Sequence, residues 1–170
     1  MSETICKDIE LSIDGMGIAI YSKGCMNYVK EGSDFFSSDF AAPSGMAAHI
    51  RKGDITGFCT GSGGDFTLKI RDGYPDAGLD QAYPVSIRLG LEVRNSTVSF
   101  VDIYWLMDWN PDIPSEQQIE LEDGFYHLTV LTRLPEEGYW GANQTIYLFF
   151  YKLDAMPELT WNGVPQLFTD

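Results

Sequence analysis

Few residue types in this chain of 170 residues are suited to acid–base or nucleophilic chemistry. The chain has 25 Asp and Glu but only two histidines, His49 and His127, and three cysteines, Cys6, Cys25 and Cys59. Histidine is the commonest general base near neutral pH, yet each histidine lies in a segment patterned like a β-strand, which predicts a place on a strand face. No Ser or Cys lies in a recognisable nucleophile motif, so a catalytic triad has no support from the sequence.

Two short motifs resemble ligand-binding loops but lack essential residues. The run from Asp108 through Trp109 to Asp112 opens like an EF-hand, but Ile113 replaces the turn glycine and Ile119 the closing glutamate. The glycine-rich run 61–65 lacks the Lys-Ser/Thr of a P-loop and the glycine order of a dinucleotide site. We therefore expect no cofactor and no metal, with a calcium site built from several loops as an alternative. Both runs are expected to be turns, the second of them in a hairpin.

The cysteine count and the N-terminus predict a cytoplasmic protein. Three cysteines fit neither a disulfide framework nor a zinc-ligand spacing, which indicates unpaired thiols in a reducing compartment. Charges interrupt residues 1–15, where a secretory signal would need an apolar stretch, and no apolar run approaches the ~20 residues that span a bilayer. No contact with a membrane is expected.

The net charge of −14 is distributed unevenly along the chain. Residues 95–170 contain 12 Asp and Glu but only two basic residues, Arg133 and Lys152. An acidic field attracts basic partners and repels nucleic acid and acidic lipid. Because no basic stripe interleaved with aromatic residues is visible, nucleic acid is not expected as a partner. The charge instead predicts a basic protein partner.

The hydrophobic pattern repeats every two residues and predicts strands almost throughout. In segment 83–93 the apolar side chains alternate strictly, and segment 146–151 is apolar on both faces, which suits the middle of a sheet. Segments 30–42 and 111–118 have room for a helical turn or two. Further strands are expected at 9–13, 18–20, 46–50, 55–60, 66–70, 97–107, 118–121, 125–134 and 145–153.

These segments predict an all-β fold, a single-domain antiparallel β-sandwich of about eight or nine strands spanning residues 1–170. Turns are expected at Asp14-Gly15, which reads as a hairpin or a kink, and at 122–124, which reads as a tight hairpin. No internal repeat or linker divides the chain, and a domain of this size buries roughly 70% of its unfolded surface.

Two segments combine large aromatic residues with carboxylates where loops are expected. The first contains Trp105 as well as Asp108, Trp109 and Asp112. Burial in the core is an alternative for Trp105, where it has at least equal weight, and also for Trp109. Aromatic residues dominate binding hot spots, and flanking acids would steer a basic partner onto them. The second segment contributes its own predicted contact residues, which are Glu136, Glu137, Tyr139 and Trp140.

The order of segments resembles the nuclease inhibitors of the competence protein J (ComJ) type. The resemblance lies in LSIDGMGIAIY at 11–21, FAAPSGMAAHIRKGDITGF at 40–58, VSIRLGLEVRNSTV at 85–98 and IELEDGFYHLTVLT at 119–132. It implies an inhibitor that binds and blocks a nuclease inside the producing cell, similar in kind to bacterial toxin immunity proteins. The chain departs from the family by extra length at 72–82, 103–117 and 135–144, and no site motif carries over.

The sequence therefore favours an intracellular immunity or inhibitor protein that binds a basic toxin, such as a nuclease, in a 1:1 complex. A sandwich that binds carbohydrate, lipid or calcium through its loops is an alternative, since Trp109, Tyr139 and Trp140 could stack on sugar rings and Asp108 and Asp112 could ligate calcium. An enzyme with a dispersed active site is a further alternative, because catalytic groups are assembled in space.

Overall fold

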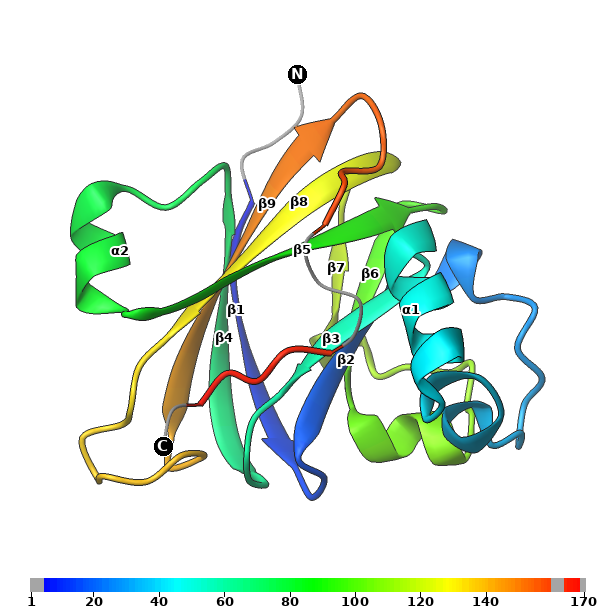
Figure 1. Ribbon diagram of the computed structural model, residues 1–170, viewed down its shortest axis with the longest axis horizontal. Helices are drawn as coiled ribbons and strands as arrows, with labels where there is room; N and C mark the ends of the chain where they lie inside the picture. The colour runs from blue at the N-terminus through cyan, green and yellow to red at the C-terminus, as the bar shows by residue number, and fades with distance from the viewer. Residues whose placement is uncertain (1–4, 160–163, 169–170) are drawn as a thin grey trace.

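The computed structural model describes residues 5–159 and 164–168, whose nine strands form two sheets (Figure 1). The five-stranded sheet has the order β1-β4-β9-β8-β5 and the four-stranded sheet the order β3-β2-β6-β7. This confirms the all-β class. The strands are β1 Cys6–Ile13, β2 Gly17–Ser22, β3 Ile55–Cys59, β4 Gly64–Asp72, β5 Val85–Val93, β6 Thr97–Asp102, β7 Gln118–Glu120, β8 Gly124–Thr132 and β9 Gln144–Leu153.

One hydrophobic core joins the two sheets. Leu68, Leu128 and Leu148 of the five-stranded sheet and Ile18 and Phe100 of the four-stranded sheet belong to a single cluster and are fully buried. The alternation read from the sequence arises because every second side chain of a strand enters this cluster. A core shared by two sheets is what a sandwich requires.

A second cluster covers the other face of the four-stranded sheet. Tyr21, Phe35, Phe40, Leu106 and Trp109 pack there beneath α1 (Pro43–Lys52), so that β2 is buried along its whole length. The remaining helical elements are short and surround this cluster or the sheet margins. They are η1 Lys23–Cys25, η2 Phe36–Phe40, α2 Ala77–Ala82, η3 Ile103–Met107 and η4 Ser115–Gln117.

The expectation of a purely antiparallel sheet is wrong. β9 lies in the middle of its sheet, as its two apolar faces predicted, and it pairs antiparallel with β8 but parallel with β4, with Leu68 opposite Ile146. The 133–143 loop reverses the chain after β8, and the returning strand inserts beside β4, which already runs in the same direction.

Three turns that were expected as hairpins, the first of them with a kink as the alternative, instead carry the chain from one sheet to the other. Residues 14–16 link β1 to β2, residues 60–63 link β3 to β4, and residues 121–123 link β7 to β8, and in each case the two strands belong to different sheets. A turn motif specifies a chain reversal but not the hydrogen-bonding partner of the strand that follows.

Two of the expected strands differ in kind or length from the structure. Residues 46–50 lie in α1, which Pro43 begins at its first turn and Gly53 ends in the left-handed conformation with φ 81°. Short apolar runs do not distinguish a strand from a buried helix. The strand expected at 97–107 ends at Asp102, whose side chain accepts a hydrogen bond from the Tyr104 backbone N–H and starts η3.

The C-terminal segment lies along the outer edge of the four-stranded sheet. The Cys59 backbone N–H donates to the Pro165 carbonyl at 2.8 Å, and the Leu167 N–H donates to the Cys59 carbonyl at 2.8 Å. Leu167 is fully buried in the main core. Residues 165–167 therefore continue the sheet beyond β3. No helix among the described residues combines the length and apolarity needed to cross a membrane.

Candidate partner-binding surface

The two aromatic–acidic segments lie at the same end of the molecule, on either side of the 14–16 turn (Figure 1). We call this surface the loop end; it consists of residues 14–16, 60–65, 103–112 and 133–143. Asp102 connects two of these segments, because its carboxylate accepts hydrogen bonds from the backbone N–H groups of Asp14 at 2.8 Å, Gly15 at 3.2 Å and Tyr104 at 3.1 Å.

The glycine-rich 60–65 turn supports the 133–143 loop. The Ser62 hydroxyl donates to the Trp140 carbonyl at 2.6 Å, and the Asp65 backbone N–H donates to the Gly141 carbonyl at 3.0 Å. The same turn is tied to the 14–16 turn, since the Thr60 N–H donates to the Met16 carbonyl at 2.9 Å. The glycine run that resembled a phosphate loop thus holds one candidate contact loop against its neighbour.

The 133–143 loop presents its predicted contact residues outward. Glu136 and Glu137 are exposed, Tyr139 is 65% exposed, and Trp140 is half-buried. Together with Arg133, Pro135 and Asn143, the two glutamates line a polar hollow of about 240 Å³. This loop therefore has the aromatic and acidic exposure that the sequence indicated.

The 103–112 segment differs from the expectation at one important residue. Asp108 and Asp112 are exposed, but Trp109 is only 3% exposed and packs against Tyr21 and Phe35, with ring centroids 5.0 and 5.6 Å away. Its place as an exposed contact residue was wrong, because the second cluster supplies enough apolar surface to bury the whole indole. The alternative of sugar stacking on Trp109 fails for the same reason.

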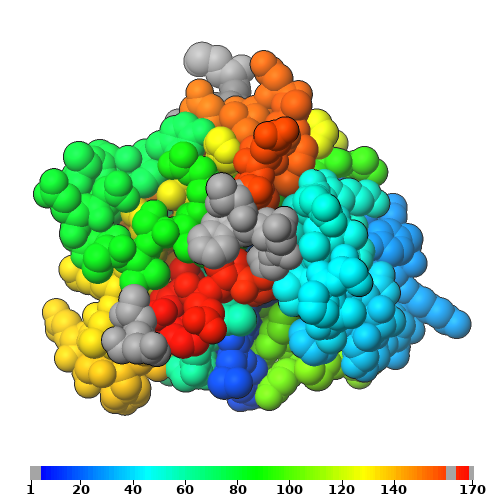
Figure 2. All heavy atoms as spheres, in the orientation of Figure 1, coloured from blue at the N-terminus to red at the C-terminus, as the bar shows by residue number. Residues whose placement is uncertain are grey.

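Exposed apolar side chains are concentrated at the loop end. Among the described residues, five of the eight large hydrophobic side chains that are exposed lie there. Clusters of this kind are typical of protein interaction sites. They are accompanied by exposed Asp14, Asp65, Asp108, Asp112, Glu136 and Glu137, and in Figure 2 the blue 14–16 turn reaches the surface between the two loops. The five side chains are Met16, Tyr104, Met107, Leu134 and Tyr139.

The acidic residues of the second half do not form one face. Glu120, Glu122, Asp123 and Asp154 lie at the opposite end, where β7 and β9 finish and β8 begins. The carboxylates of residues 95–170 therefore lie at both ends of the molecule, because consecutive strands carry their flanking turns to alternate ends. Asp14 and Asp65, from the first half of the chain, complete the acidic group at the loop end.

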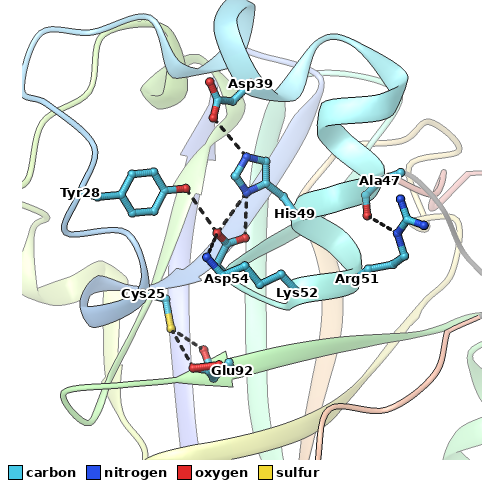
Figure 3. A network of polar contacts seen from close by, with 9 residues as sticks. All are labelled: Cys25, Tyr28, Asp39, Ala47, His49, Arg51, Lys52, Asp54 and Glu92. Carbon is cyan, nitrogen blue, oxygen red and sulfur yellow. Dashed lines mark hydrogen bonds and ion pairs between the residues drawn. The ribbon is translucent and has the colours of Figure 1, made fainter.

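Sequence reasoning missed a polar network that surrounds His49 on α1 (Figure 3). Nδ1 of His49 lies 2.9 and 3.1 Å from the two carboxylate oxygens of Asp54, and Nε2 lies 3.3 Å from Oδ2 of Asp39. Tyr28 donates its hydroxyl to Asp54 at 3.3 Å, and Lys52 Nζ lies 3.8 Å from the same carboxylate. Pro43 and Gly53, which suit the first turn and the end of a helix, were the signal that would have placed His49 on a helix.

This network holds structure together and leaves no group set up for nucleophilic attack. Both ring nitrogens of His49 face carboxylates. Cys25 lies nearby, but burial and the neighbouring Glu92 carboxylate raise the pKa of its thiol to about 11. The thiol is therefore protonated near neutral pH and is a poor nucleophile. What the network does is fix the 26–40 segment against α1 and β3.

His127 sits on the outward face of β8, as its alternation predicted. Its Nδ1 lies 2.7 Å from the hydroxyl of Tyr74, and the Arg88 guanidinium stands 4.7 Å from the Tyr74 ring centroid. Partial burial and the Arg88 charge lower the pKa of His127. Within residues 5–159 and 164–168, no three His, Cys, Asp or Glu side chains converge as a metal site.

Comparison with known proteins finds similarity in structure alone. No protein-family model and no curated protein matches the sequence. The crystal structure of ComJ, inhibitor of the DNA degrading activity of NucA, from Bacillus subtilis, matches with a TM-score of 0.51 and 16% identity over 89% of this chain and 100% of that chain. The structure of Crocagin biosynthetic gene J matches with a TM-score of 0.55 and 12% identity, over 87% and 98% of the two chains. The chain therefore has a ComJ-like fold.

Proposed function

We propose that this protein is a cytoplasmic inhibitor that binds a basic nuclease in a 1:1 complex and blocks it through the loop end. The observation that carries the proposal is the concentration of exposed apolar side chains and carboxylates at that end. The ComJ-like fold supports an inhibitor, since ComJ itself inhibits the DNA-degrading activity of NucA. No catalytic role is assigned to any residue.

The chemistry of the loop end suits a nuclease surface. A nuclease has to be positively charged where it binds phosphate, so a group of carboxylates can occupy that surface in place of the nucleic acid. Tyr139 and Tyr104 supply large, mostly exposed rings that lose little conformational entropy on contact. The net charge of −14 adds steering, which raises association rates roughly 10- to 1000-fold. We therefore expect association to slow as salt is added.

A gene deletion tests the function without knowledge of the partner. Extracts of the source organism that lack this protein should degrade DNA faster than wild-type extracts, and adding back the purified chain should restore inhibition. Unchanged DNA degradation in the deletion extract, with no inhibition by added protein, would rule the function out.

A matched pair of charge-reversal variants tests which end of the molecule contacts the nuclease. Glu136→Lys with Glu137→Lys changes the loop end, whereas Glu120→Lys with Asp154→Lys makes the same change in net charge at the opposite end. We expect the first variant to lose at least tenfold in inhibition and the second to retain it within about twofold. An equal loss in both variants would mean that net charge alone matters, and full inhibition by the first would exclude the 133–143 loop as a contact.

A further inference from the structure

The 14–16 turn lies in the middle of the loop end, between the two aromatic–acidic segments (Figure 1). Its Met16 side chain is 64% exposed, and Tyr104 on the neighbouring segment is 52% exposed. Gly15 packs between them, because a Cβ on Gly15 would lie 3.5 Å from Cδ1 of the Tyr104 ring. An apolar side chain and an aromatic ring thus face solvent from adjoining segments at the centre of this surface.

Hydrogen bonds hold the backbone that carries these two side chains. The Asp102 carboxylate accepts from the backbone N–H groups of Gly15 and Tyr104, so one side chain positions both segments. The Met16 carbonyl accepts from the Thr60 N–H. A Cβ on Gly15 would lie 2.5 Å from Oδ1 of Asp102, so the turn packs directly on that carboxylate. The centre of the loop end is therefore in place before a partner binds.

The tip of the 133–143 loop has less support. Tyr139 is 65% exposed, and residues 136–139 are all exposed. Within the part of the chain that the structure describes, the backbone of this tip makes one bond, from the Gly138 N–H to the Pro135 carbonyl at 2.9 Å. Ordering a flexible segment on contact costs binding free energy. We therefore expect Tyr139 to contribute less to binding than Met16 and Tyr104.

Carboxylates flank this apolar centre on both sides. The loop end contains six acidic residues and a single basic one, Arg133, whose guanidinium stands 4.5 Å from the ring centroid of Tyr83. Over residues 5–159 and 164–168, none of the six carboxylates belongs to an ion pair. An apolar centre within a polar rim is typical of protein interfaces. A complementary partner therefore presents basic residues around an apolar site.

We propose that Met16 and Tyr104 form the contact centre of the loop end: they enter an apolar site on the nuclease that lysine and arginine side chains surround, and Asp102 is the positioning residue for both. This inference rests on the proposed function and specifies which residues of that surface supply most of the binding energy. Methionine adapts to an irregular apolar site, whereas a tyrosine ring fills one with little loss of conformational entropy. The carboxylates mainly steer the encounter.

Single substitutions in the DNA-degradation assay test the contact centre. Purified variants are titrated into the extract of the deletion strain, and the concentration that halves DNA degradation is measured. We expect Met16→Gln and Tyr104→Ala each to raise that concentration at least tenfold, and Tyr139→Ala to raise it less than fivefold. Tyr151→Ala is the control and should change it less than twofold, because Tyr151 is 43% exposed near the end of β9 that lies opposite the loop end. Thermal unfolding checks that each variant is folded.

Salt dependence separates the contact centre from the charged rim. The loss caused by Met16→Gln should be the same at low and high salt, because the contact that it removes is apolar. The loss caused by Glu136→Lys with Glu137→Lys should shrink as salt is added, since salt screens exposed charges. The same salt dependence in both variants would contradict an apolar contact at Met16.

Asp102→Asn tests the positioning role with both contact side chains intact. Whichever way the amide turns, one carboxylate oxygen is replaced by an NH₂ group, so a backbone N–H of Asp14 or Tyr104 loses its acceptor. We expect shifted amide signals for Asp14, Gly15 and Tyr104 in the 15N-labelled chain, together with at least threefold weaker inhibition by a protein that is still folded. Wild-type inhibition by this variant, with or without the shifts, would overturn the positioning role.

The outcomes distinguish this inference from the proposed function. If Met16→Gln and Tyr104→Ala each lose inhibition at least tenfold while Tyr151→Ala retains it, the contact centre is supported. If either loses less than tenfold, or if Tyr139→Ala or Tyr151→Ala loses as much, the nuclease docks elsewhere and only the inference fails. If the wild-type chain does not inhibit at all, the proposed function fails and the inference fails with it.

Discussion

Replacing Asp54 by alanine should lower the free energy of unfolding by about 3 kcal/mol, because it removes the carboxylate on which a buried hydrogen-bond network converges. Asp54 is 2% exposed, and its carboxylate contacts His49 at 2.9 and 3.1 Å, the Tyr28 hydroxyl at 3.3 Å and Lys52 Nζ at 3.8 Å. Alanine would leave Nδ1 of His49 without its partner in a site that water reaches poorly.

The structure supplies a control with nearly the same contact geometry. Asp8 lies 2.9 Å from Arg71, the distance that also separates Asp54 from His49, but the Asp8 side chain is 48% exposed and the Asp54 side chain 3%. An exposed ion pair contributes at most about 1 kcal/mol. Asp8→Ala should therefore cost about 1 kcal/mol or less, so the difference between the two variants measures what burial and the additional contacts of Asp54 contribute together.

Urea unfolding at pH 7.5 followed by fluorescence gives both free energies, and thermal unfolding gives an independent value. For a chain of this size each kcal/mol lowers the melting temperature by about 2–4 °C, so Asp54→Ala should melt about 6–12 °C lower. If Asp54→Ala costs no more than Asp8→Ala, the network around His49 does not stabilise the fold and the reasoning is wrong.

Three further predictions concern single residues. Trp109→Ala should cost about 3–5 kcal/mol in urea unfolding, because it empties a nearly closed site; a cost below about 1 kcal/mol would contradict its burial. Gly64→Ala should cost about 2 kcal/mol by the same measurement, since Gly64 has φ 148° and a Cβ there would meet the Gly141 carbonyl, and unchanged stability would refute this. Because the pKa of His127 is lowered in the folded protein, the unfolded chain binds the proton more tightly, and stability should fall as the pH drops below about 6.5. His127→Gln should make that fall shallower between pH 7 and 5, and an unchanged slope would exclude His127 as a contributor.

The strands could be predicted from the sequence because each one shows in the hydrophobic pattern of its own segment. Segment 83–93 alternates with period two since one face of β5 enters the core, and residues 146–151 are apolar on both faces since β9 lies in the middle of its sheet. Strand pairing could not be predicted in the same way. The parallel contact of β4 with β9 joins residues almost 80 positions apart, and no local signal specifies it.

The exposed loop residues of the candidate surface could also be predicted from nearby residues, whereas burial by distant segments could not. Glu136, Glu137 and Tyr139 lie in a loop that is exposed, and glycines on both sides of Tyr139 and Trp140 indicated this. Trp109 also lies in a segment that combines aromatic residues with carboxylates, but its burial depends on Phe35 and Tyr21, which come from distant segments.

The C-terminal segment at residues 165–167 has a practical consequence for anyone who shortens or extends this chain. By lying along β3 it occupies backbone N–H and C=O groups that would otherwise be open to other molecules. A truncation before Pro165 would expose that edge together with the pocket left by Leu167, and open strand edges recruit further strands. Such a truncated protein would self-associate and precipitate, so purification tags belong at the opposite terminus.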